Sequence, residues 1–180
     1  IATTYYMLMD MGNILLFEPQ QKELKQHVKL AADRLLEWMK PNGQWELAYE
    51  NKTLKPTFTD ITDLRPTFYG LLIAYEILKD KKYLQAAIQG ADWYVENAVK
   101  KGHFLGVCGD TRFVPDFATA QSAQALLELY NVTKNEKYKE AAISTAKIYT
   151  ASVYTHPIPT SVVKQVKGIE RKDWEISQVG

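Results

Sequence analysis

A helical pattern that repeats at an offset of 55 residues constrains this chain more than any other feature of the sequence. The outer-helix set Tyr83, Ala86, Ala87, Ala91, Trp93 and Tyr94 recurs 55 positions later as Tyr138, Ala141, Ala142, Ala146, Ile148 and Tyr149. The same shift backwards reaches Val28, Ala31, Ala32, Leu36, Trp38 and Met39. Upstream, Leu71 and Leu72 match Leu126 and Leu127 going forward and Leu16 and Phe17 going back. Repeats of this length indicate stacked supersecondary units.

The spacing of apolar residues assigns two kinds of helix to each repeat. One-sided stripes at i, i+3, i+4 and i+7 predict outer helices over about 28–39, 83–98 and 138–153. The helices that precede them, about 3–17, 68–78 and 118–130, are apolar around more of their circumference and are expected to be inner helices. The sequence therefore predicts an all-α fold of three inner–outer hairpins of about 55 residues each.

The connections between these helices alternate between short and long. The links at 18–20, 79–81 and 133–135 are short and make each inner helix antiparallel to its outer partner. The links at about 40–63, 101–116 and 155–173 have lengths that are uncommon without a function. All three long links are expected at the same end of the fold, which makes that end the predicted functional face.

Composition excludes several classes of function. The net charge is +1, from 22 basic and 21 acidic residues without a block of like charges, so no nucleic-acid partner is expected. No apolar run is long enough to span a bilayer, so no membrane partner is expected. Because the chain begins at Ile1 and stops at Gly180 just as a new segment starts, residues 1–180 are interpreted as a single domain or part of a larger one.

Acidic residues precede the inner helices and are the first candidates for chemistry. Asp60, Asp63, Asp116 and Asp173 stand at or near the ends of the long links. Helix capping explains any one of them, because Asp accepts hydrogen bonds from free N–H groups at a helix start. As a set, however, these aspartates stand at the starts of successive inner helices. Those helix starts are expected to converge on the opening of the cavity that the inner helices enclose.

The two earlier links carry similar acidic and basic groups. The first holds Asp60, Asp63 and Arg65, and the second holds Asp110, Arg112 and Asp116. Two carboxylates that face each other across a pocket are what glycosidic bond hydrolysis requires. Asp63 and Asp116 are the predicted catalytic pair. The alternative for Asp110 and Arg112 is local pairing on a solvated loop.

Aromatic and histidine side chains on the long links are candidates for substrate contact. Trp45, Phe104 and Trp174 are placed where a ring can stack on a sugar, or can instead anchor its loop by folding back onto the helices. His103 is a possible hydrogen-bond donor to substrate. The three histidines and single cysteine share no metal-ligand spacing, so no metal site is expected.

Three features of the sequence are shared with a known architecture: the alternating helices, the Gly-x-Trp of residues 43–45, and the sequence segments 83–87 and 135–142. In these features the chain resembles the six-hairpin, α/α-toroid glycosidases. It is most similar to the unsaturated glucuronyl and rhamnogalacturonyl hydrolases. The resemblance implies a sugar bound over the N-terminal ends of the inner helices, close to Asp60, Asp63, Asp110, Asp116 and Asp173. Three hairpins would make half of such a toroid, so further hairpins or a second copy of the chain are expected beside it.

The leading hypothesis is a carbohydrate-active enzyme that cleaves an oligosaccharide or polysaccharide without a cofactor. Arg65 and Arg112 would hold substrate groups, and Trp45 and Trp174 would supply stacking surfaces. The alternatives are a non-catalytic helical-repeat scaffold, and a toroidal lyase or epimerase in which Tyr69 or His103 serves as base. The resemblance favours a periplasmic or secreted location over a cytoplasmic one.

Overall fold

A computed structural model describes residues 2–106, 116–152 and 163–172. The chain divides into two compact units, Ile1–Tyr149 and Thr150–Gly180. Its helices are α1 (Ala2–Phe17), α2 (Lys22–Trp38), α3 (Phe68–Leu78), α4 (Lys81–Tyr94), the π-helical turn η1 (Val95–Val99), α5 (Phe117–Thr133) and α6 (Glu136–Ser152). The strands are β1 (Ala48–Tyr49), β2 (Pro56–Thr57), β3 (Val163–Val166) and β4 (Ile169–Lys172).

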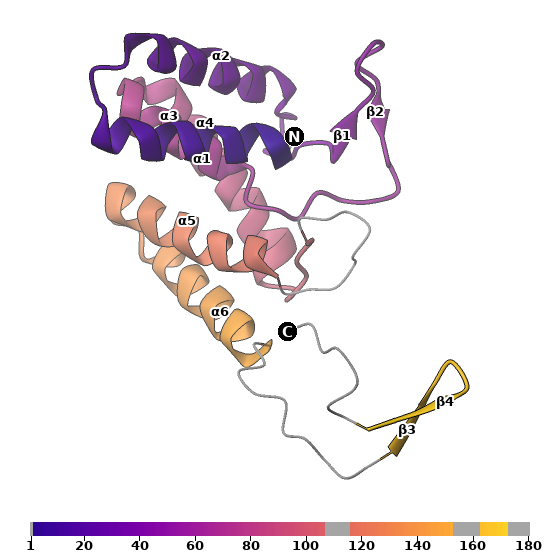
Figure 1. Cartoon of the computed structure of the whole chain (residues 1–180). Helices are drawn as coiled ribbons and strands as arrows, with labels where there is room; N and C mark the ends of the chain where they lie inside the picture. Colours follow the sequence, from indigo (N-terminus) through magenta and orange to yellow (C-terminus); the bar gives the residue numbers. More distant parts are fainter. Residues whose placement is uncertain (1, 107–115, 153–162, 173–180) are drawn as a thin grey trace. The chain divides into compact units, whose positions relative to one another are not determined.

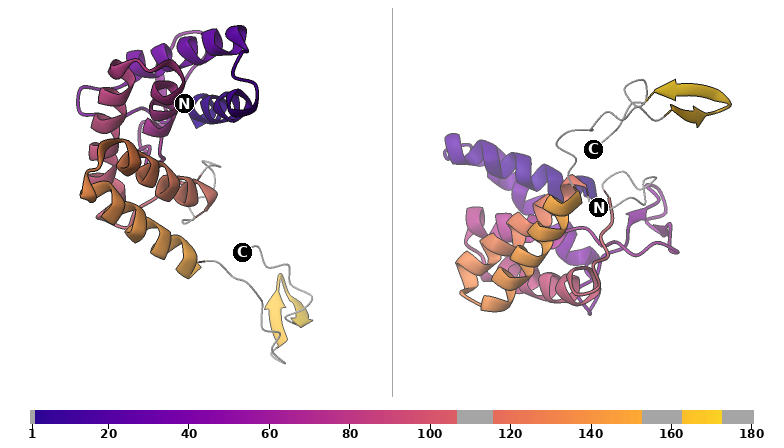
Figure 2. Two further views of the ribbon diagram at one scale, coloured as in Figure 1. Left: turned by 90° about the vertical axis from the view of Figure 1, so that its left-hand side faces the viewer. Right: turned by 90° about the horizontal axis from the view of Figure 1, so that it is seen from below.

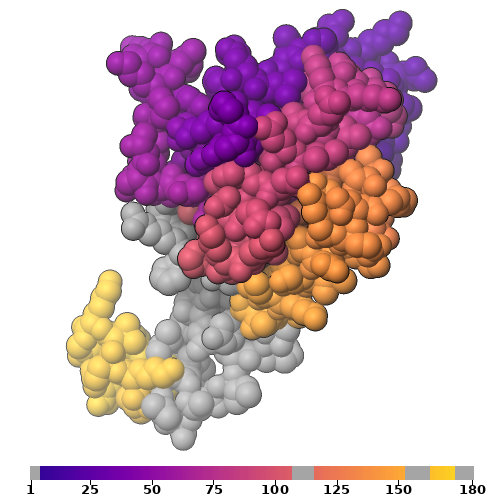
Figure 3. Space-filling model, turned by 180° about the vertical axis from the view of Figure 1, so that it is seen from behind, coloured from indigo at the N-terminus to yellow at the C-terminus, as the bar shows by residue number. Residues whose placement is uncertain are grey.

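The helices form three successive antiparallel hairpins, α1–α2, α3–α4 and α5–α6 (Figure 1). Helix α1 packs on α2 and α3, and α3 also packs on α2, α4 and α5. Figure 2 shows the same succession from two other sides, and in Figure 3 the surface of α4 and η1 lies between those of the first hairpin and α6. The predicted all-α hairpin fold is confirmed.

Helix α3 is the centre of the hydrophobic core. Every residue from Phe68 to Ala74 is buried, because α3 is enclosed by helices on several sides. Gly70 allows this close approach, since a Cβ there would lie within 3.0 Å of side-chain atoms of Leu8 and Leu35. The prediction that α3 is an inner helix is confirmed.

The short turns of the second and third hairpins are built alike. Inner helices α3 and α5 end at Lys79 and Lys134, whose φ angles of 59° and 57° are left-handed. In the next residue of each turn, an Asp80 or Asn135 side-chain oxygen accepts a hydrogen bond from the backbone N–H two residues later. The 55-residue repeat therefore extends to the caps that reverse the chain.

The outer helices are joined by a repeated tyrosine contact. Tyr83 on α4 donates to Asp33 on α2 (O···O 2.7 Å), and Tyr138 on α6 donates to Asp92 on α4 (2.5 Å). The lysine before each tyrosine, Lys82 or Lys137, pairs with the same aspartate. Hydrogen bonds from Lys29 and Lys82 hold the pKa of Asp33 well below its usual range. These contacts fix the spacing between neighbouring hairpins.

The first hairpin departs from the predicted phase. Leu71 and Leu72 are fully buried, whereas their predicted counterparts Leu16 and Phe17 are 78% and 86% exposed. Helix α1 ends at Phe17, while α3 continues six residues past Leu72, so the inner helix of the first hairpin is displaced in register. The match of Leu16 and Phe17 to Leu71 and Leu72 is wrong, although the hairpin itself is present.

Two of the long links contain short antiparallel hairpins that the sequence analysis did not predict. Strands β1 and β2 pair within the first link, and β3 and β4 pair within the third. The turn between β3 and β4 has Lys167 and Gly168 at φ 51° and 77°, which is the left-handed pair that a tight hairpin turn needs. The new segment expected before Gly180 lies outside the described residues, and the interpretation of residues 1–180 as a single domain or part of a larger one stays a prediction.

Candidate functional site

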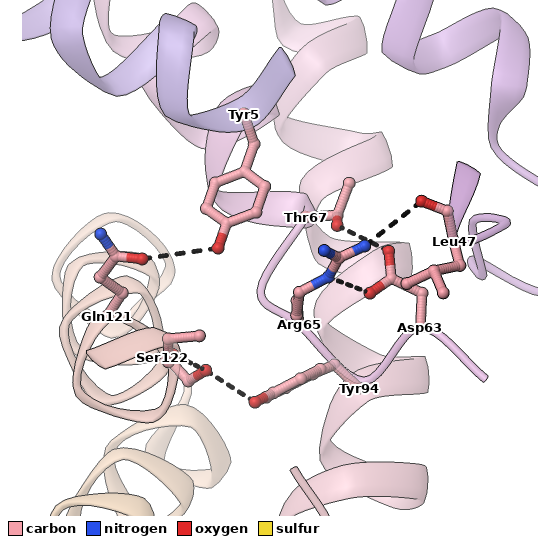
Figure 4. Close-up of polar contacts among 9 residues, drawn as sticks. Tyr5, Leu47, Asp63, Arg65, Thr67, Tyr94, Gln121 and Ser122 are labelled. Carbon is pink, nitrogen blue, oxygen red and sulfur yellow. Dashed lines mark hydrogen bonds and ion pairs between the residues drawn. The ribbon is translucent and has the colours of Figure 1, made fainter. Parts of the chain in front are cut away.

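A polar cluster, most of whose members are buried, lies where the inner helices begin. We call it the entrance cluster. Its members come from the start of α1, the segment before α3, the end of α4 and the start of α5, and all but one of them are shown in Figure 4: Tyr5, Asp63, Arg65, Thr67, Tyr94, Gln121, Ser122 and, outside that view, Asp116. A hydrogen bond from Leu105 N to Leu64 O joins the first two long links at this end, as predicted.

Asp63 and Arg65 form a buried ion pair in the entrance cluster. The Arg65 Nε donates to Asp63 Oδ1 (2.6 Å), its Nη2 donates to the Leu47 carbonyl (3.3 Å), and Thr67 Oγ1 donates to Asp63 Oδ2 (3.4 Å). Asp63 is 4% exposed and Arg65 is 6% exposed. Burial raises the pKa of Asp63, and the positive charge of Arg65 opposes that rise. The pair therefore anchors the first long link to the helices.

Asp116 has a different environment at the start of α5. Its Oδ1 accepts a hydrogen bond from Ala118 N (2.8 Å), so Asp116 is the N-cap of the helix. The residue is partly exposed, in contrast to Asp63. The capping interpretation is confirmed for Asp116, while Asp63 bonds to side chains and does not cap α3.

Two tyrosines connect the entrance cluster to α5. Tyr94 at the end of α4 is buried and its hydroxyl lies 2.6 Å from Ser122 Oγ. Tyr5 on α1 donates a longer bond to Gln121 Oε1 (3.4 Å). Burial is the main cause that raises the pKa of Tyr94, and the charges of Asp63 and Asp116 add smaller contributions. The cluster thus connects α1, α4 and α5 around the two candidate carboxylates.

The other predicted site residues differ in exposure, and some of them lie outside the described residues. Asp60 and His103 are exposed on the first and second long links. Trp45 is only 4% exposed, its indole N donates to Leu35 O (2.9 Å), and its ring lies against Gly90, where a Cβ would come within 2.7 Å. This is the anchoring arrangement, and Phe104, also buried, shares it. Asp110, Arg112, Asp173 and Trp174 lie outside the described residues.

A comparison with protein families identifies the architecture. The model of Glycosyl Hydrolase Family 88 matches residues 65–167, which is more than half of the 180-residue chain. The chain belongs to this family. Family 88 is a six-hairpin glycosidase family that acts on unsaturated glucuronyl and rhamnogalacturonyl substrates, so the predicted resemblance is confirmed. Searches of curated proteins and of solved structures found no match.

A second group of polar residues lines a cavity, and most of this group lies in the region of the chain that matches glycoside hydrolase family 88. A cavity of about 500 Å³ lies between α1, α3 and α5, away from the entrance cluster. Tyr69 OH donates to Glu128 Oε1 (2.8 Å) and accepts from Gln124 Nε2 (3.0 Å) at its wall. Burial and the neighbouring carboxylate of Glu128 raise the pKa of Glu76. Of the residues named in the sequence analysis for a role in chemistry, Tyr69 alone lines this cavity among the described residues.

The cavity bears on the alternative in which Tyr69 is the base of a lyase. Burial and then the charge of Glu128, whose carboxylate also accepts the Tyr69 hydrogen bond, raise the pKa of Tyr69. A base must lose its proton to act, and these contacts favour the protonated phenol. The environment of Tyr69 therefore works against that role.

Sequence analysis missed several residues of both groups. Tyr94 was interpreted only as a repeat position, and Tyr5, Gln121 and Ser122 carried no signal, because a polar residue on an inner helix is common. Tyr69 and Gln124, which bond to each other, are 55 residues apart, so the repeat offset contained a clue to the cavity wall.

Among the described residues, no group of three or more His, Cys, Asp or Glu side chains could hold a metal ion. No helix in that part of the chain is long and apolar enough to cross a membrane. The expectations of no metal, no cofactor and no membrane partner stay predictions.

Proposed function

We propose that this chain carries the entrance of a glycoside hydrolase site that cleaves acidic oligosaccharides, with Asp116 and Asp63 as its two carboxylates. Asp116 is partly exposed and stands at the helix start, where it can reach a glycosidic oxygen or an attacking water. Asp63 lies deeper and acts as its electrostatic partner. The observation that carries the proposal is that one carboxylate lies just before α3, in the buried cluster, and another starts α5 as its N-cap, in a chain of family 88.

Arg112 is the proposed contact for an acidic substrate group. Arg65 is buried and already paired with Asp63, whereas Arg112 precedes Asp116 by four residues in the sequence of the second long link. An arginine binds a carboxylate through two parallel hydrogen bonds, which suits the uronyl groups of the family's substrates. We assign substrate contact to Asp60 and His103, which are exposed, and, from their place in the sequence alone, to Asp110, Arg112, Asp173 and Trp174.

The test separates catalysis by Asp116 from its capping role. Asn caps a helix nearly as well as Asp but has no carboxylate, so Asp116→Asn keeps α5 and removes the proposed acid or base. Asp80 is a matched control, since its side chain also accepts from the N–H two residues later, at the start of α4. We expect Asp116→Asn to lower kcat on unsaturated glucuronyl or rhamnogalacturonyl disaccharides by about 100-fold or more, and Asp80→Asn to leave it unchanged.

The readout is release of reducing sugar together with ultraviolet absorbance. Hydrolysis releases a reducing end without creating a double bond, whereas a lyase creates an unsaturated product whose absorbance rises. Equal activity of Asp116→Asn and wild type would exclude Asp116 as a catalytic residue. A rise in absorbance from saturated substrates would replace the hydrolase proposal with the lyase alternative.

A further inference from the structure

A tyrosine at the end of α4 carries a hydroxyl that packing alone does not require. Tyr94 is 1% exposed, while Met39 and Tyr149, at the equivalent positions of the other repeats, are only partly buried. Burying a hydroxyl is unfavourable unless it is hydrogen-bonded. The bond to Ser122 therefore explains why the position tolerates a buried phenol.

The direction of this hydrogen bond follows from its neighbour. Ser122 Oγ donates its single hydrogen to the Ala118 carbonyl (2.7 Å), so it can only accept from Tyr94 (Figure 4). Ala118 N in turn donates to Asp116 Oδ1 (2.8 Å). A continuous path runs from the Tyr94 hydroxyl through Ser122 and Ala118 to the Asp116 carboxylate.

The backbone next to Tyr94 has an unusual form. The π-helical turn η1 starts at the following residue, with Lys100 N bonded to Val95 O (3.0 Å) and His103 N bonded to Ala98 O (3.0 Å). Such turns insert one residue into a helix and are frequent at functional sites. Here the turn separates the end of α4, which holds Tyr94, from the second long link that leads to Asp116.

We infer that Tyr94 and Ser122 form a positioning relay that fixes the first turn of α5 and so the orientation of the Asp116 carboxylate. Tyr94 is a positioning residue, because its hydroxyl is enclosed by α4 and α5 and acts through Ser122. Burial keeps the phenol protonated, so it remains a donor throughout the working pH range. The inference rests on the proposed catalytic role of Asp116.

The experiment compares Tyr94→Phe, Ser122→Ala and the double variant with Tyr83→Phe as a matched control. Tyr83 is equally buried and also donates to another element, but it does so at the start of α4. We expect each relay variant to lower kcat about 10-fold with little change in KM, as for the loss of one hydrogen bond. The double variant should lose little more than either single one, because the two groups act as a unit.

Two further measurements separate positioning from general structural damage. The pH dependence of kcat should shift in Tyr94→Phe, because Asp116 is reoriented, and should stay unchanged in Tyr83→Phe. Amide hydrogen exchange in residues 118–122 should speed up at least several-fold in Tyr94→Phe, since the first turn of α5 is no longer tied to α4.

The outcomes distinguish the relay from the proposed function. Unchanged exchange in residues 118–122 would overturn the relay, whatever the activity. Faster exchange with unchanged kcat and pH profile would overturn its role in positioning Asp116. If wild-type protein hydrolyses none of the disaccharides, the proposed function fails with the catalytic half of the inference, while the exchange data still decide whether the relay exists.

Discussion

Of the aspartates in the segments that lead into α3 and α5, the one closest to each helix, Asp63 or Asp116, has a different set of contacts. Asp116 caps α5 through Ala118 N and is partly exposed. Asp63 is buried and bonds to Arg65 and Thr67, while α3 begins without a side-chain cap. The same residue type before an inner helix thus anchors a loop in one repeat and starts a helix in the next.

The different contacts of Asp63 and Asp116 determine the role that each carboxylate can have. Asp63 is buried and paired with Arg65, which stays charged, so the pair fixes the first long link, and the role that we propose for Asp63 in catalysis is electrostatic only. Asp116 accepts a hydrogen bond from a backbone N–H and is partly exposed. A substitution of Asp63 should therefore lower stability more than a substitution of Asp116 does, and a substitution of Asp116 should act mainly on activity.

The largest effect is expected from Asp63→Asn. It removes the charge that pairs with Arg65 and leaves a buried guanidinium uncompensated, which should lower the free energy of unfolding by about 3–5 kcal/mol. Urea denaturation measures this loss. The exposed Asp60 supplies the control, since Asp60→Asn should change stability by no more than about 0.5 kcal/mol. Equal effects of the two variants would show that the buried pair contributes nothing to stability.

Arg65→Gln should cost less than Asp63→Asn, and its cost should depend on pH. Without Arg65, burial raises the pKa of Asp63 unopposed, so the folded protein keeps a proton that the unfolded chain loses above about pH 4. Stability is then greatest below that pH and falls by up to about 1.4 kcal/mol per pH unit as the pH rises towards the folded-state pKa. Urea denaturation from pH 4 to pH 8 measures the slope, and a flat difference from wild type would contradict the prediction.

Asp116→Ala should destabilise the protein by about 1 kcal/mol, the usual cost of losing an N-cap, and Asp116→Asn by only a few tenths. Activity should not follow this ranking, because both substitutions remove the carboxylate and should lower the hydrolysis rate alike. Thermal or urea unfolding of the two variants, measured beside their hydrolysis rates, tests this. A loss near that of Asp63→Asn would show that Asp116 is as deeply integrated as Asp63.

A small effect is expected from Thr67→Val. The Thr67 hydroxyl donates to Asp63 over a long 3.4 Å, and valine keeps the shape of the side chain. The loss should be about 0.5 kcal/mol, at the low end of the range for one hydrogen bond. A loss above about 2 kcal/mol in urea denaturation would mean that Thr67 is a main support of the buried pair.

Much of the fold was predictable because it depends on local periodicity. The stripe around Tyr83 and Ala87 and the short turns near Lys79 and Lys134 gave helix positions, pairing and order. The register of α1 was not predictable, because the exposed Leu16 and Phe17 mimic the apolar pair Leu71 and Leu72 in sequence. The paired strands within the long links were also missed, since two to four residues give little periodicity.

The site was predictable only in part. Asp63, Arg65 and Asp116 were singled out correctly as neighbours of inner-helix starts, and the structure places them in or beside one cluster. The roles assigned to them stay predictions. Tyr94 and Ser122 escaped notice because their bond joins residues 28 apart on different helices, a proximity that no local pattern reports.

The sequence by itself determined that this chain is a series of helical hairpins with an acidic residue before each later inner helix, because hydrophobic spacing and turn residues act over a few neighbouring positions. Only the tertiary structure decided which aspartate is buried against arginine and which one caps a helix. Burial and electrostatic partners are set by segments distant in the chain, and they determine the pKa, the accessibility and hence the chemistry of each carboxyl group.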